Sequence, residues 1–95
     1  MENSKSTGNI KKRRPRRKRM YLYLMNDDKN SFDYVISMIT SLIPSYNTLQ
    51  AEQIARLVHT AGKCEIYSGF APDIFLLYAK FQKSNLNIQI KNHKS

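Results

Sequence analysis

Four side chains are the candidates for chemistry in this 95-residue sequence: Cys64, His59 and the consecutive aspartates Asp27 and Asp28. Nucleophilic catalysis needs a thiol or hydroxyl group with a base and an orienting group close by. Nothing near Cys64 in the sequence indicates an activated thiol, and an unpaired cysteine is usually a small buried apolar residue. We therefore predict that the protein is not an enzyme and has no catalytic residue.

A metal site could combine Asp27, Asp28 and His59, because carboxylates and imidazole are common metal ligands. Two consecutive aspartates, however, are more often the solvent-facing residues of a turn. The sequence has a single cysteine, no glycine-rich phosphate loop and no His-Glu-x-x-His motif. We predict neither a metal nor a cofactor.

The net charge of +9 is concentrated at the N-terminus. Residues 1–19 carry nine Lys and Arg residues and one acid, whereas residues 20–95 carry seven basic and six acidic residues. A segment so highly charged and so poor in large apolar residues cannot bury enough surface to fold. We predict a disordered basic tail at 1–19, a single domain at 20–91 and a short C-terminal tail at 92–95.

The longest apolar run, residues 20–25, is far too short to cross a membrane. It follows a basic stretch, as the core of a signal peptide would, but no small-residue cleavage site comes after it. The lone cysteine fits a reducing compartment. We expect a soluble, cytoplasmic protein with no membrane partner.

Apolar periodicity predicts six elements in the order β-α-α-β-α-β. This order is typical of the α+β class, here a small single domain of three helices packed on a three-stranded antiparallel sheet. The predicted segments are strands at 20–25, 63–70 and 86–91 and helices at 32–43, 48–61 and 72–84.

Local signals mark the ends of the first two helices. Asn30 or Ser31 can cap the first helix, and Asn47 with Gln50 forms a capping-box pattern before the second. Gly62 suits the position that ends the second helix. We assign the apolar face of the second helix to Leu49, Ile54, Leu57, Val58 and Ala61.

His59 lies near the end of the second predicted helix, and Asn26-Asp27-Asp28 follows the first predicted strand. Each has an ordinary interpretation: a partly buried histidine with a local hydrogen bond, and a turn. Their combination, with Gly62 and Lys63 just after the histidine, gives residues 20–91 a resemblance to the ClpS family. The matching stretches are the strand and turn at 21–28, the helix start at 32–36, Gln53 with residues 57–63, and Phe70 with Asp73.

ClpS proteins are adaptors that deliver N-degron substrates, proteins marked by their N-terminal residue, to a Clp AAA+ unfoldase and its protease. The resemblance implies that Asn26, Asp28 and His59 bind the α-amino group of such a substrate. Each can accept a hydrogen bond from an ammonium group, which has three donors and a positive charge. An adjoining apolar pocket would bind a first residue that is Leu, Phe, Tyr or Trp. The positions that match the family's pocket are Leu24, Asn30, Phe32, Val35, Ala55, Val58 and Leu86.

The sequence departs from the family's pattern at several of these positions. Phe32 and Ala55 both stand where the family usually has Met, and Asn30-Ser31 replaces the usual Thr-Pro. On the third helix, Tyr78 stands where the family has a docking Lys, with Asp73 at the partner acid. The resemblance implies that this helix docks on the N-terminal domain of a ClpA- or ClpC-type unfoldase.

A second class of function depends on the basic tail. Nine basic residues within 1–19 would neutralise several phosphates and bind nucleic acid non-specifically, with a steep dependence on salt. The alternative prediction is therefore a small nucleic-acid- or ribosome-associated protein. The domain itself is nearly neutral and shows no RNA-binding signature, so the adaptor interpretation is favoured.

Overall fold

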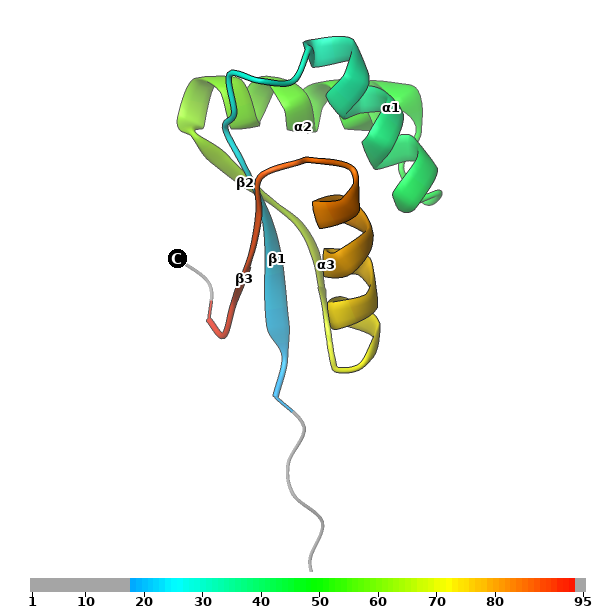
Figure 1. The fold of residues 1–95 in the computed structure, drawn as a ribbon, viewed down its shortest axis with the longest axis vertical. Helices are drawn as coiled ribbons and strands as arrows, with labels where there is room; N and C mark the ends of the chain where they lie inside the picture. The colour runs from blue at the N-terminus through cyan, green and yellow to red at the C-terminus, as the bar shows by residue number, and fades with distance from the viewer. Residues whose placement is uncertain (1–17, 94–95) are drawn as a thin grey trace, which may run out of the picture.

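Six elements follow one another in the predicted β-α-α-β-α-β order in the computed structural model, which describes residues 18–93 (Figure 1). The elements are β1 (Met20–Met25), α1 (Phe32–Leu42), α2 (Thr48–Ala61), β2 (Lys63–Gly69), α3 (Asp73–Lys83) and β3 (Ile88–Lys91). This confirms the predicted α+β class. Of the predicted tail at 1–19, residues 1–17 lie outside the described part of the chain, and so do residues 94–95.

The sheet has the strand order β2-β1-β3, and β1 pairs antiparallel with both neighbours. Because β1 is central, the loop that follows it lies between two other chain segments. The amide of Met25 donates to the carbonyl of Asn87 at 2.8 Å, and that of Asn26 donates to the carbonyl of Gly62 at 2.9 Å. These bonds fix the end of β1 against the end of α2 and the start of β3.

A β-bulge interrupts the pairing of β1 with β2. Leu22 lies opposite Tyr67 and Tyr23 lies opposite Glu65, so Ile66 is the extra residue on β2. Ile66, only 1% exposed, and Tyr67 both pack on the core side of β2, so the bulge places two consecutive side chains on that face.

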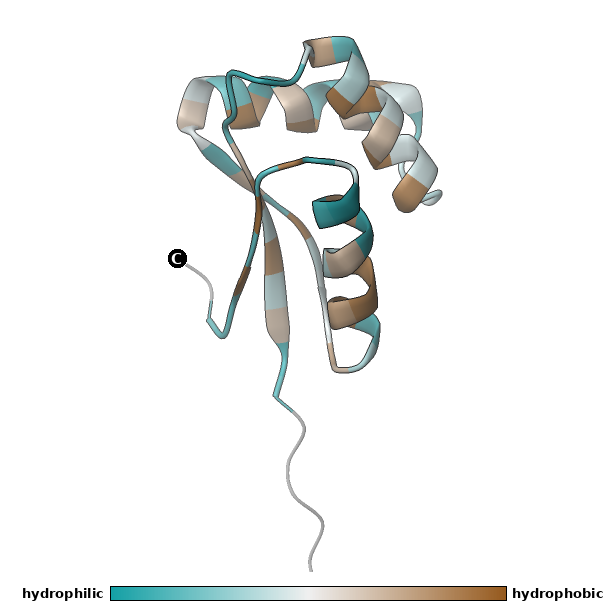
Figure 2. Cartoon of the chain, in the orientation of Figure 1, coloured by the Kyte–Doolittle hydropathy of each residue, from teal (hydrophilic) through white to brown (hydrophobic). Residues whose placement is uncertain are grey.

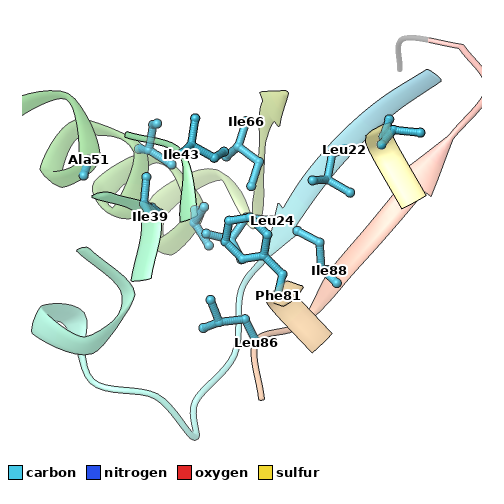
Figure 3. Close-up of a cluster of buried hydrophobic side chains, with 12 residues drawn as sticks. Leu22, Leu24, Ile39, Ile43, Ala51, Ile66, Phe81, Leu86 and Ile88 are labelled. Atoms are coloured by element: carbon cyan, nitrogen blue, oxygen red, sulfur yellow. The ribbon is translucent and has the colours of Figure 1, made fainter. Parts of the chain in front are cut away.

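The hydrophobic core lies between one face of the sheet and the helices (Figure 3). Leu22 and Leu24 extend from β1 toward Ile39 of α1 and Phe81 of α3, and each of the four is at most 1% exposed. Burying an apolar side chain of this size contributes about 1.5–3 kcal/mol. The core thus fixes the positions of α1, α3 and β1, whose ends frame the loops described below.

The capping residues of α1 and α2 lie where the sequence predicts them. Ser31, rather than Asn30, caps α1, and its hydroxyl accepts from the amide of Tyr34 at 3.1 Å. Asn47 and Gln50 form the predicted capping box at the start of α2. Gly62 ends α2 with a φ of 90°, a left-handed backbone conformation that residues with a Cβ rarely adopt.

The predicted apolar face of α2 is partly wrong. Ile54 and Val58 are buried, but Leu49 and Leu57 are 63% and 51% exposed, and Ala61 is exposed as well. The buried series starts instead at Ala51 and follows the i, i+3, i+4, i+7 spacing of one helix face. Leu49 and Leu57 fall outside that series, so their apolar character does not identify the side of α2 that packs in the core.

Hydropathy is unevenly distributed along α3: after Asp73 its first half is apolar, and its C-terminal end is hydrophilic (Figure 2). Ile74 and Phe81 are buried, whereas Phe75 and Leu76 in the first half of the helix are 50% and 61% exposed. Within residues 18–93, no helix has both the length and the apolar character needed to span a membrane.

Candidate functional site

The two aspartates after β1 have different surroundings. Oδ1 of Asp27 accepts from the amide of Lys29 at 2.8 Å, and its Oδ2 accepts from Nδ2 of Asn30 at 3.2 Å. Asp28 is exposed, and no partner for its carboxylate is found among the described residues. The ordinary interpretation of this segment as a turn is therefore right for Asp27, which holds the turn, while Asp28 presents its charge to the exterior.

His59 lies in the last turn of α2. The ordinary interpretation, a partly buried histidine with a local hydrogen bond, is wrong: His59 is exposed and has no hydrogen-bond partner within residues 18–93. The bond between Asn26 and Gly62 draws the end of α2 to the turn after β1. His59 therefore lies at the same cavity as the turn, described next.

One cavity of about 300 Å³ is lined both by polar acceptors and by apolar side chains. Its lining includes Asn26, Asp28 and His59, the three side chains predicted to bind an amine. It also includes all seven predicted pocket positions, which are Leu24, Asn30, Phe32, Val35, Ala55, Val58 and Leu86. The residues singled out in four separate stretches of sequence thus surround a single hollow.

Three further residues line the cavity that were not predicted as binding positions: Met25, Asn87 and Asp27, which the sequence suggested only as a possible metal ligand. Met25 and Asp27 are sequence neighbours of predicted site residues, and that adjacency was an available signal. Asn87 follows the predicted pocket residue Leu86, but its place depends on the backbone bond to Met25, which sequence periodicity does not report.

The start of α1 holds the turn that carries Leu86. Nδ2 of Asn30 donates to the carbonyl of Asn85 at 2.9 Å, and the hydroxyl of Tyr34 donates to the carbonyl of Ser84 at 2.7 Å. Asn85 itself has a left-handed backbone with a φ of 65°, a conformation that asparagine tolerates better than most residues. Asn30 therefore lines the cavity and also fixes the opposite wall.

The apolar residues that line the cavity are buried on one side of it and exposed on the other. Leu24, Ala55, Val58 and Leu86 are all buried, with Ala55 only 3% exposed. Phe32 is 41% exposed and lines the cavity at the start of α1. The cavity thus has an apolar interior, an aromatic side chain at its exposed edge, and the three acceptors beside it.

The alternative chemistries have little support in the described structure. Burial, followed by the nearby carboxylate of Glu65, raises the pKa of the Cys64 thiol, which opposes formation of a reactive thiolate. Cys64 is not among the residues that line the cavity. Over residues 18–93, no three His, Cys, Asp or Glu side chains are grouped closely enough to hold a metal ion.

The two predicted docking residues on α3 do not share one helix face. Asp73 is exposed in the first turn, while Tyr78 is half-buried and its hydroxyl accepts from Nε2 of Gln82 at 2.8 Å. Five residues of α-helix turn the chain by about 140° beyond a full revolution. A partner that touched both residues would have to reach around the side of α3.

The fold and the site define a class of protein: a small α+β domain whose candidate site is a cavity lined by both polar and apolar side chains. Residues 15–80 match the model of the family described as "ATP-dependent Clp protease adaptor protein ClpS". The chain belongs to the ClpS family, a family of adaptors rather than catalysts, which confirms the resemblance seen in the sequence.

A solved structure has the same fold: that of ClpS2 from Agrobacterium tumefaciens, bound to L-phenylalaninamide. The match has a TM-score of 0.69 and covers 82% of this chain and 100% of the other, with 13% sequence identity. At that identity the likeness establishes the fold alone. No curated protein sequence matches this chain.

Proposed function

We propose that this protein binds the free α-amino group and bulky apolar first residue of N-degron substrates and delivers them to a Clp AAA+ unfoldase-protease. The observation that carries the proposal is the joint lining of one cavity by Asn26, Asp28, His59 and seven other predicted pocket positions. Membership of the ClpS family supports the adaptor role.

An α-ammonium group fits the three polar side chains by chemistry. It has three N–H donors, and the amide oxygen of Asn26, the carboxylate of Asp28 and the neutral imidazole of His59 are all acceptors. The carboxylate also compensates the positive charge. Hydrogen bonds to a charged group contribute about 1.5–3 kcal/mol each. The amine is therefore the proposed anchor of the substrate.

The first side chain of the substrate would occupy the apolar part of the cavity. Burying a Leu or Phe side chain there would contribute a further 1.5–3 kcal/mol or so. L-Phenylalaninamide, the ligand of the structurally similar ClpS2, is a free amine with an aromatic side chain, which supports this ligand class. Phe32 and Ala55, both Met in the family pattern, enlarge one wall and reduce another, so we propose a pocket of altered shape for Leu, Phe, Tyr or Trp.

Delivery is proposed to involve α3 and a ClpA- or ClpC-type unfoldase. Asp73 presents a carboxylate in the first turn, and the exposed Phe75 and Leu76 lie two and three residues further along the helix. A charged group beside exposed apolar residues is a suitable contact for another protein. We propose Tyr78 as a second contact, and residues 20–91 as the binding domain between the segments 1–19 and 92–95.

Delivery is tested with a degradation assay. We expect the protein to accelerate degradation of a fluorescent reporter with an N-terminal Phe by a ClpA- or ClpC-type unfoldase and its protease. The matched reporter that begins with Ala should be degraded at the same rate with and without the protein. If neither reporter is affected while Phe-first peptides still bind, the pocket is right and the delivery role is wrong.

A further inference from the structure

A second hollow adjoins the candidate cavity beside the turn that follows β1. It has a volume of about 580 Å³, and it is lined by Asp27, Lys29, Asn30, Asn85, Leu86 and Asn87. Four of these residues also line the candidate cavity: Asp27, Asn30, Leu86 and Asn87. The two spaces are therefore neighbours, but they differ in character, because every lining residue of the second hollow except Leu86 is polar or charged.

The second hollow has hydrogen-bonding groups that the domain itself does not use. Nδ2 of Asn30 donates to Oδ2 of Asp27 and to the carbonyl of Asn85, which leaves Oδ1 of Asn30 as an acceptor. Asn85 and Asn87 are exposed, and no hydrogen bond of their side-chain amides is found within residues 18–93. Each such amide has two N–H donors and an acceptor oxygen. The second hollow can therefore bind a polar ligand without the loss of a bond inside the domain.

Lys29 gives the second hollow a positive charge that no described carboxylate neutralises. The side chain is exposed, and its ammonium group has no ion pair or hydrogen bond within residues 18–93. The carboxylate of Asp27, by contrast, accepts a hydrogen bond at each oxygen, from the amide of Lys29 and from Nδ2 of Asn30. An acidic group that entered the second hollow would therefore have the ammonium of Lys29 as its partner.

The substrate of the proposed function is a polypeptide, so its chain must continue out of the candidate cavity after the first residue. The second Cα lies only about 3.8 Å from the first, so the second residue contacts the protein surface that adjoins the cavity. Its backbone N–H and C=O groups need polar partners. The side chains of Val35, Ala55 and Val58 offer none, whereas the asparagines of the second hollow do.

We infer that the second hollow binds the second residue of the substrate, and that Lys29 favours an acidic side chain, Asp or Glu, at that position. The inference rests on the proposed function and deepens it, because it gives the site a preference beyond the first residue. The carboxylate of the substrate pairs with the ammonium of Lys29, and the asparagine amides bind the peptide backbone. Exposed ion pairs are weak, so the preference is a factor of about three rather than a strict requirement.

The test uses the full chain and two fluorescent peptides that differ only at the second residue, one beginning Phe-Glu and the other Phe-Gln. At about 50 mM salt, the ratio of the Phe-Glu affinity to the Phe-Gln affinity should be about threefold higher in the wild type than in Lys29→Gln. Comparing ratios cancels the effects of Asp27 and Asp28, which both proteins have. Lys29→Gln keeps the backbone amide that donates to Asp27, so the turn should stay folded.

Two controls distinguish a local contact from a general effect of charge. Lys80→Gln removes an exposed charge from the last turn of α3, lines neither hollow, and should leave the ratio at its wild-type value. With the glutamate moved to the fifth position of the peptide, Lys29→Gln should no longer change the ratio. An unchanged Phe-Glu ratio in Lys29→Gln, or an equal change in Lys80→Gln, would overturn the inference.

A third peptide, which begins Ala-Glu, separates this inference from the proposed function. If the wild type prefers Phe-Glu to Ala-Glu but Lys29→Gln leaves the Phe-Glu ratio unchanged, the preference for the second residue is wrong and the binding of the first residue stands. If the wild type binds Phe-Glu no better than Ala-Glu, the proposed function and this inference both fail.

Discussion

A peptide that begins with Phe should lose all measurable affinity for this protein when its α-amino group is acetylated. Acetylation removes the positive charge and two of the three N–H donors, while every other atom of the peptide is kept. The acceptors Asn26, Asp28 and His59 would then face an uncharged amide that satisfies at most one of them. Leaving polar groups without partners on binding is costly, so the loss should exceed that of any single side-chain substitution.

This result is measured by fluorescence anisotropy with a pair of peptides that differ only at the amine. The label is attached near the C-terminus, so that it cannot contact the cavity. Retained affinity of the acetylated peptide would show that the amine is not the anchor and that the apolar pocket alone binds the ligand.

Asp28→Ala should weaken binding of the same Phe-first peptide by about 2 kcal/mol, or about 30-fold, without unfolding the protein. The carboxylate is exposed and has no partner within residues 18–93, so its loss leaves no buried group unsatisfied. Asp28→Asn keeps the size of the side chain and removes its charge, and it should lose most of the same affinity.

Two other aspartates are controls for this prediction. Asp33, in the first turn of α1, is exposed and does not line the cavity, so Asp33→Asn should bind normally. Asp27 holds the turn through Lys29 and Asn30, so Asp27→Ala should lower the thermal stability as well as the affinity. If Asp28→Ala instead unfolds the protein, as judged by circular dichroism, Asp28 is a structural residue of the turn.

The sequence predicted the elements whose signals are local. The Asn47–Gln50 capping box and the left-handed Gly62 each depend on neighbouring residues only, and the structure has both. The β-α-α-β-α-β order follows from the same kind of signal. The family resemblance then supplied the residues that line the cavity, which periodicity alone could not bring together.

The errors and omissions concern contacts between distant segments. Leu49 and Leu57 are apolar but exposed, because packing against α1 and β2 selects the Ala51 side of α2. The bulge places Ile66 and Tyr67 on the same face of β2, which explains why the alternation in β2 is weak in the sequence. The different roles of Asp27 and Asp28 likewise depend on the folded turn, where only Asp27 accepts bonds from its neighbours.

The most direct test of the proposed function is one titration series with peptides that differ only in their first residue. Phe, Tyr, Trp and Leu present large apolar side chains to the pocket. Ala is too small to fill it, and Lys and Glu would bring a charge into it. The account predicts that the first four peptides bind at least about tenfold more tightly than the last three, a ratio that corresponds to about 1.4 kcal/mol. Equal affinity across all seven peptides would contradict it.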